Sequence, residues 1–152
     1  MKNIIFIIII SYISFFSISM DSQKIICARD SSKVNADTSF NLYNYTPLEF
    51  IEILKEFSFP TFTLWKEYEN WVKEEDIPRL IILLDSKDSC ANINSALSSF
   101  ADMNYSTVAQ EAAYMILSFQ TGKYPADLNS SKYVWDKGDI IKWWSNYKKK
   151  IE

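Results

Sequence analysis

Histidine is absent from this chain of 152 residues, and glycine occurs only twice, at Gly122 and Gly138. Without histidine, no imidazole can bind a metal ion or activate a nucleophilic cysteine. Glycine supplies the positive φ angles of tight hairpins, phosphate-binding loops and calcium loops, so its scarcity argues against all three. We therefore expect no metal site and no cofactor.

The chain also lacks an excess of positive charge. It has 16 basic and 19 acidic side chains, for a formal net charge of −3. A nucleic-acid-binding domain is expected to carry a basic patch, so the composition argues against a nucleic-acid partner. An acidic surface would instead suit a basic protein, because opposite charges steer association.

The N-terminus has the pattern of an export signal. Lys2 is followed by an apolar run from Ile4 to Phe16, which closes on Ser17-Ile18-Ser19. A positive start, a short apolar run and a small-residue cleavage site predict a signal peptide over residues 1–19. The alternative interpretation is a retained membrane anchor. It is less favoured because a spanning helix needs about 20 apolar residues and this run is shorter. The sequence thus predicts a periplasmic or secreted protein that meets a membrane only if this segment is not cleaved.

The two cysteines are Cys27 and Cys90. In an exported chain an even count favours a disulfide bond, which here would stabilise the fold by about 4 kcal/mol through loop closure. The bridge would attach the polar N-terminal arm, residues 20–45, to the rest of the chain. The alternative is two unrelated thiols, with Cys90 a small buried residue.

Helical patterns dominate residues 46–152, which we expect to form a helical domain. Capping residues at Thr46, Asp76, Thr107 and Asp136 predict helices that begin just after them, and apolar spacing predicts two more helices near residues 64–72 and 90–101. The run Leu80–Leu84 is apolar all round, which indicates a central helix buried on most sides. The residues expected to face the core are Phe50, Ile51, Leu54, Phe57, Leu64, Trp65, Tyr68, Trp71, Val72, Ile93, Ala96, Leu97, Phe100, Val108, Ala112, Met115, Ile116, Phe119, Ile140, Trp144, Tyr147 and Ile151.

The four capping residues recur at intervals of 30, 31 and 29 residues. Residues 76–88 resemble the first helix and turn of a HEAT-type repeat, residues 93–100 are similar to its second helix, and residues 106–113 look like the start of the next unit. This resemblance covers about residues 76–120. It implies an all-α fold of about six helices stacked as pairs, as a short HEAT-like solenoid or an irregular bundle, with a protein-binding surface and no catalytic residues.

A cluster of aromatic residues lies near the C-terminus, with Trp143 beside Tyr133 and Trp135. Adjacent helical residues point about 100° apart, so Trp143 and Trp144 cannot share one buried face. If Trp144 faces the core, Trp143 lies at its margin, where an exposed indole could anchor a protein partner or a sugar ring. The alternative is that Trp143 packs under residues 124–135.

Glu111 is the carboxylate that the sequence most favours as a functional residue, because it borders the apolar stripe of its predicted helix. A partly buried glutamate can have a raised pKa and act as a general acid or base. The alternative is that an acid in the first turn simply favours the helix dipole. No second carboxylate is paired with it in the sequence.

These patterns predict an exported, non-enzymatic protein-binding domain, in its most concrete form a periplasmic immunity-type inhibitor of a toxin. The expected partner-binding residues are Trp143, Trp135, Tyr133 and Glu111. Two alternatives stay open: a cell-envelope hydrolase that uses Glu111 as general acid or base, and a protein that binds a glycan or other ligand through surface aromatics.

Overall fold

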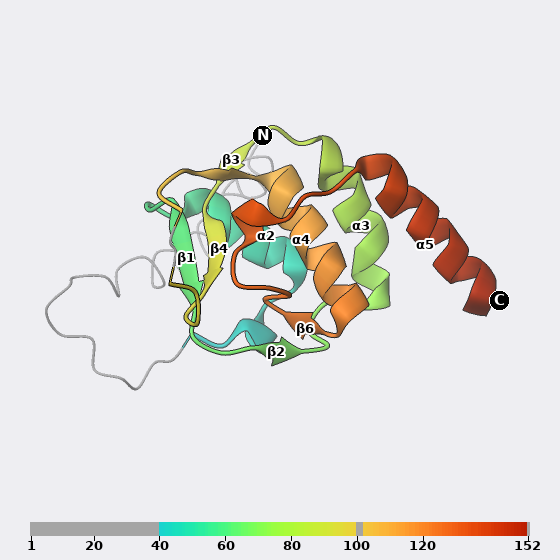
Figure 1. The fold of residues 1–152 in the computed structure, drawn as a ribbon, viewed down its shortest axis with the longest axis horizontal. Coiled ribbons are helices and arrows are strands. Elements are labelled where there is room, and N and C mark those ends of the chain that lie inside the picture. Colours follow the sequence, from blue (N-terminus) through green and yellow to red (C-terminus); the bar gives the residue numbers. More distant parts are fainter. Residues whose placement is uncertain (1–39, 100–101, 152) are drawn as a thin grey trace, which may run out of the picture. The chain divides into compact units, whose positions relative to one another are not determined.

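The computed structural model describes residues 40–99 and 102–151, and a compact unit runs from Asn41 to Glu152 (Figure 1). The predicted signal peptide at residues 1–19, most of the predicted arm at 20–45, and Cys27 lie outside the described residues. Export and the Cys27–Cys90 bridge therefore stay predictions. Cys90 itself is buried, with 1% of its surface exposed.

The described residues form a mixed α/β fold. The helices are α2 (Pro47–Glu56), α3 (Ile77–Ile82), α4 (Val108–Thr121) and α5 (Lys137–Ile151). The strands are β1 (Thr61–Leu64), β2 (Tyr68–Glu69), β3 (Ser89–Cys90), β4 (Asn92–Ser95), β5 (Ser106–Thr107) and β6 (Lys123–Tyr124). Short 3₁₀ turns occur at Leu42–Asn44 (η2), Glu74–Asp76 (η3), Leu83–Asp85 (η4) and Ser130–Lys132 (η5). The predicted all-α fold and the HEAT-like resemblance are therefore wrong, because strands replace two of the expected helices.

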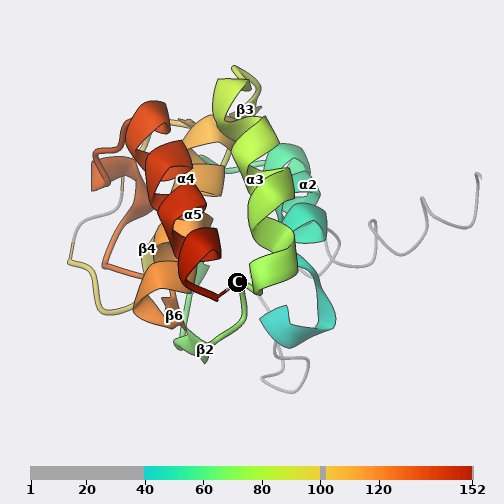
Figure 2. The same cartoon turned by 90° about the vertical axis from the view of Figure 1, so that its right-hand side faces the viewer.

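The strands pair into three small sheets. β1 and β4 are parallel, with Thr61 opposite Asn92 and Leu64 opposite Ser95. The pairs β2–β6 and β3–β5 are antiparallel. In Figure 1 the β1–β4 pair lies on one side of the unit, α2 and α4 lie in the middle, and α5 projects on the other side. Figure 2 views the unit from the α5 side, with α5 in front of α4 and α3 to the right of them.

The four helices predicted after Thr46, Asp76, Thr107 and Asp136 are confirmed as α2, α3, α4 and α5, and the ends of three of them follow from local chemistry. Thr46 and Glu49 form a capping box at the start of α2, with Pro47 in its first turn. The Thr107 side chain accepts a hydrogen bond from the Gln110 amide and caps α4. Gly122 ends α4 with a φ of 76°, a left-handed conformation that glycine adopts without strain. The third, α5, begins at Lys137, directly after the predicted cap Asp136.

The helix predicted near residues 64–72 is wrong. Residues 61–64 read Thr-Phe-Thr-Leu, and this alternation sends Phe62 and Leu64 inward as a strand. Trp65, expected in the core, is 86% exposed. Asn70 has a φ of 48°, which a right-handed helix cannot contain.

The helix predicted near residues 90–101 is also wrong. Asn92–Ser95 form β4, in which all four residues are buried, while Leu97 is 78% exposed. The buried amide of Asn92 donates to the backbone carbonyls of Asp102 and Asn104, so polar residues can occupy this strand. The helix predicted after Asp76 is present as α3, but the Asp76 side chain does not cap it. The run Leu80–Leu84 is not buried on most sides as expected, because only Leu80 and Leu84 are buried and Ile82 is 75% exposed.

Aromatic side chains from distant segments meet in the core. Phe50 on α2 is fully buried and makes edge-to-face contacts with Phe62, Trp71 and Tyr124, at centroid distances of 5.3, 5.7 and 6.2 Å. These contacts join α2 to β1, to the segment after β2 and to β6. None of the helices in the described ranges is long and apolar enough to cross a membrane.

Candidate functional site

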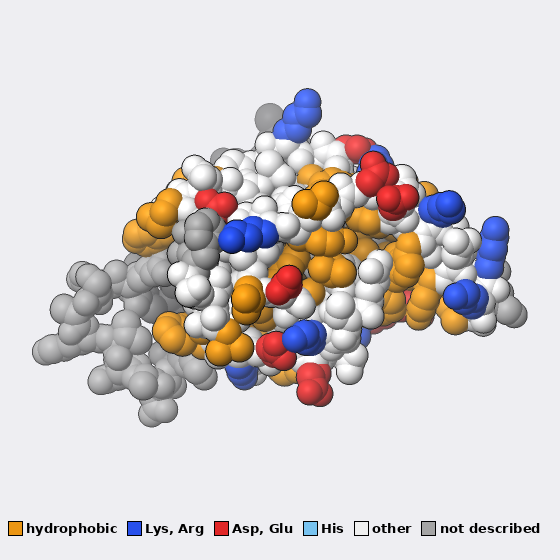
Figure 3. Space-filling model, in the orientation of Figure 1, with side chains coloured by type: hydrophobic (Ala, Val, Ile, Leu, Met, Phe, Trp, Pro, Cys, Tyr) orange, Lys and Arg blue, Asp and Glu red, His pale blue; other side chains and the backbone are white. Residues whose placement is uncertain are grey.

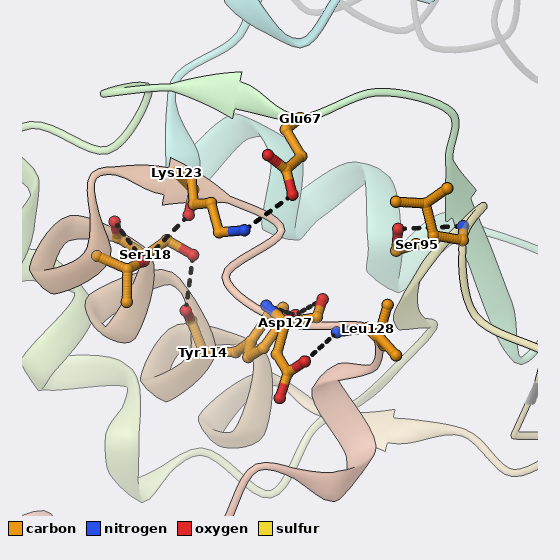
Figure 4. A network of polar contacts seen from close by, with 9 residues as sticks. Glu67, Ser95, Tyr114, Ser118, Lys123, Asp127 and Leu128 are labelled. Atoms are coloured by element: carbon orange, nitrogen blue, oxygen red, sulfur yellow. Dashed lines mark hydrogen bonds and ion pairs between the residues drawn. The ribbon is translucent and has the colours of Figure 1, made fainter.

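Helix α4 positions the segment that connects β6 to α5, residues 125–136, here called the connecting segment. The Tyr114 hydroxyl donates to the Asp127 carbonyl and accepts a hydrogen bond from the Asp127 amide at 2.8 Å (Figure 4). The amide of Ser95, on β4, donates to the Leu128 carbonyl at 2.8 Å. The start of the connecting segment is therefore fastened to both α4 and β4.

Gln110, in the first turn of α4, holds the far end of the connecting segment. Its Nε2 donates to the carbonyls of Ser130 and Tyr133, at 2.6 and 2.8 Å. Its Oε1 accepts a hydrogen bond from Trp135 Nε1 at 2.7 Å. The Gln110 side chain therefore fixes the backbone of the connecting segment and the indole of Trp135.

Glu111 follows Gln110 and is fully buried, with 0% exposure. Its Oε1 accepts a hydrogen bond at 2.8 Å from Ser130 Oγ, which in turn accepts one from the Ile93 amide. Burial raises the pKa of Glu111 to about 7, although the hydroxyls of Ser106 and Ser130 and the amide of Ile93 act in the opposite direction. The other carboxyl oxygen, Oε2, makes no hydrogen bond of ordinary geometry among the described residues. Glu111 thus ties Ser130 to α4 from inside the domain.

A pocket of about 290 Å³ lies where the end of the connecting segment meets α5 and the C-terminal part of α4. We call it the aromatic pocket. The residues that line it are Gln120, Tyr133, Val134, Trp135, Asp136, Asp139, Ile140 and Trp143. In Figure 3 hydrophobic side chains form a band across the middle of this face and onto α5, with charged side chains around it.

The aromatic pocket continues into a row of rings on α5. Trp143 contacts Phe119 of α4 edge-to-face at a centroid distance of 6.2 Å. Tyr147 also meets Phe119, at 5.6 Å, and stacks on Trp144 at 5.3 Å. Of the inward stripe expected on α5, only Ile140 is buried, and Ile151 is 53% exposed. The aromatic residues of α5 are thus only partly covered by α4.

The structure brings together three of the four residues expected to bind a partner, because Tyr133, Trp135 and Trp143 all line the aromatic pocket. Glu111 lies elsewhere: it is buried beneath the connecting segment and is not part of the pocket lining. Sequence reasoning missed Gln110, Asp136 and Asp139 as members or supports of this site. The adjacent polar pair Gln110-Glu111 in the apolar run of α4 was a signal for the buried network, whereas nothing in the sequence pointed to Ser130.

Replacing Gln110 with alanine is expected to lower the free energy of unfolding by about 2 kcal/mol. The change removes three hydrogen bonds and leaves two partly buried carbonyls without their donor. Chemical denaturation followed by tryptophan fluorescence measures the loss. Gln120→Ala is the matched control, since Gln120 is exposed on the same helix and should change stability by less than about 0.5 kcal/mol. Equal losses for the two variants would contradict the role given to Gln110.

Among the described residues, no group of three or more Cys, Asp or Glu side chains could hold a metal ion. Comparisons with protein-family models, with curated proteins and with solved structures found no match to this chain. The site must therefore be interpreted from its own geometry and chemistry.

Proposed function

We propose that the Asn41–Glu152 unit is a non-enzymatic binding domain that captures another protein through the aromatic pocket. The observation that carries this proposal is the convergence of Tyr133, Trp135 and Trp143 on one open pocket. Tryptophan and tyrosine are the residues most enriched at the energetic centres of protein interfaces. Hydrogen bonds from α4 hold the connecting segment in place before any partner arrives, which lowers the entropy lost on binding.

The geometry gives less support to a hydrolase that uses Glu111. A general acid must come within hydrogen-bonding distance of the substrate atom that it protonates. Glu111 has 0% exposure and does not line the aromatic pocket. Its hydrogen bond with Ser130 instead favours a structural role, because it holds the connecting segment, which carries Tyr133 and Trp135.

A periplasmic immunity-type inhibitor is the specific form of the proposal that suits the predicted export signal. Such a protein would need to be small, to remain outside the cytoplasm and to cover a toxin's active site with a pre-formed surface. The acidic balance of the chain, with a formal net charge of −3, would favour a basic toxin through electrostatic steering.

Selection from a displayed random-peptide library tests the binding proposal even while the partner is unidentified. We expect the wild-type chain to enrich a set of related peptides that Trp143→Ala no longer retains. Trp65→Ala is the matched control, because Trp65 is an 86% exposed tryptophan that does not line the pocket. Enrichment of the same peptides on Trp143→Ala, or loss of binding with Trp65→Ala alone, would contradict the proposal.

A further inference from the structure

We propose that the aromatic pocket receives a lysine or arginine side chain of the partner protein. This inference rests on the proposed function, and it adds the chemistry of the group that enters. Three observations support it. The charged side chains that line the pocket are acidic, three aromatic residues line it as well, and elsewhere in the domain an aromatic ring and a carboxylate hold a lysine of the same chain.

The charged groups in the pocket lining are Asp136 and Asp139, and no lysine or arginine lines it. One oxygen of Asp136 accepts the Asp139 amide at 3.0 Å and so caps α5. Lys137 lies between them in sequence but forms a salt bridge with Asp85 of η4, which is not part of the lining. Among the described residues, neither Asp136 nor Asp139 forms a salt bridge, so a cation from outside would meet two carboxylates that no lysine or arginine of this unit neutralises.

Three aromatic residues, Tyr133, Trp135 and Trp143, line the same pocket as these two carboxylates. The face of an aromatic ring attracts a cation, and indole does so most strongly. Several rings around one pocket are the arrangement by which proteins recognise ammonium groups. Carboxylates beside the rings favour a cation over a neutral group of the same size.

The domain contains a similar arrangement that one of its own lysines fills. Lys148 Nζ lies 5.7 Å from the ring centroid of Trp144 and 2.9 Å from Glu74 Oε1. A ring and a carboxylate thus hold an ammonium group close to Trp143 on the same helix. Lys66 Nζ also lies 4.9 Å from the ring centroid of Tyr68, a second contact between an ammonium group and an aromatic ring. The aromatic pocket offers the same partners to a cation of another chain.

Calorimetric titration of the full chain with short blocked peptides tests the inference. The probes are acetyl-Gly-Arg-Gly-amide, acetyl-Gly-Lys-Gly-amide, the same peptide with neutral citrulline in place of arginine, and N-acetylglucosamine. We expect the two cationic peptides to bind about tenfold more tightly than the citrulline peptide, from ring and carboxylate contacts together. Asp139→Asn should lose most of this preference, whereas Asp88→Asn, which changes an exposed acid outside the pocket, should keep it.

The outcomes separate this inference from the proposed function. The inference of a cationic ligand would be overturned if the citrulline peptide bound as tightly as the arginine peptide, or if the sugar bound more tightly than all three peptides. Either result would leave the pocket as a binding site. Absence of binding by the cationic peptides would also overturn it, and the peptide-library selection would then decide the proposed function independently. Equal effects of Asp139→Asn and Asp88→Asn on peptide affinity would contradict binding of the cation in the aromatic pocket.

Discussion

Raising the pH from 4.5 to 8.5 is expected to lower the free energy of unfolding of the wild-type chain by about 3 kcal/mol relative to Glu111→Gln. The pKa of Glu111 is about 7 in the folded protein and has its ordinary value of 4.5 when the chain is unfolded. Each pH unit between these values corresponds to about 1.36 kcal/mol. Because the folded pKa is the higher one, the neutral carboxyl stabilises the fold at low pH, and this stability is lost as pH rises through 7.

The groups that surround Glu111 do not titrate in the same range. Cys90 on β3 has a pKa raised by burial to about 12. Burial also raises the pKa values of Tyr114 and Tyr124 above their ordinary value of 10. Glu111 is thus the member of this cluster expected to change charge near neutral pH.

Glu111→Gln is a suitable reference because it resembles the protonated acid. The amide oxygen can still accept the Ser130 hydroxyl, and the side chain no longer ionises. Urea denaturation of both proteins across the pH range gives the difference directly. Parallel stability curves for wild type and Glu111→Gln would contradict the raised pKa of Glu111.

Replacing Phe50 with alanine is expected to lower the free energy of unfolding by about 4 kcal/mol, the usual loss for a large aromatic side chain in a packed core. Phe50 is fully buried, and its ring contacts Phe62, Trp71 and Tyr124. The cavity would therefore weaken contacts to β1, to β6 and to the segment after β2. Thermal or chemical denaturation measures this effect.

Phe59→Ala is the matched control for Phe50→Ala. Phe59 is the same residue type in the same domain, but 52% of its surface is exposed. Its loss should lower the free energy of unfolding by less than about 1 kcal/mol. Similar losses for both variants would mean that Phe50 does not lie at the centre of the core.

The sequence predicted helices well where a local signal marks their ends. Thr46 with Glu49 begins α2, and Gly122 ends α4, because capping chemistry depends on neighbours within one turn. Strands were missed because their pairing partners are distant in the sequence. The segment Asn92–Ser95 reads as polar, and its buried amides are explained only by the carbonyls of Asp102 and Asn104 and by Asn129 across a bridge.

The candidate site could be predicted only in part, for the same reason. The sequence identified Trp135 and Trp143 as candidate binding residues because both are large aromatic residues close together in the chain. Their convergence with Asp139 on one pocket depends on how Gln110 holds the connecting segment, which is a contact across 25 residues. The sequence shows that Glu111 borders the apolar stripe of its helix, but the structure places it outside the aromatic pocket. Its complete burial depends on Ser130 and β4, which the sequence pattern does not connect to it.

The most direct test of the aromatic pocket as a binding site is an NMR titration that follows the indole N–H signals of the five tryptophans. Acetyl-Gly-Arg-Gly-amide is added to the isotope-labelled full chain. We expect shifts for Trp135 and Trp143, which line the aromatic pocket, and unchanged signals for Trp65, which is exposed elsewhere, and Trp71, which is buried. A shift at Trp65 in place of the pocket signals would contradict the claim that this pocket is the binding site, and no shift at any of the five indoles would contradict a cationic ligand for it.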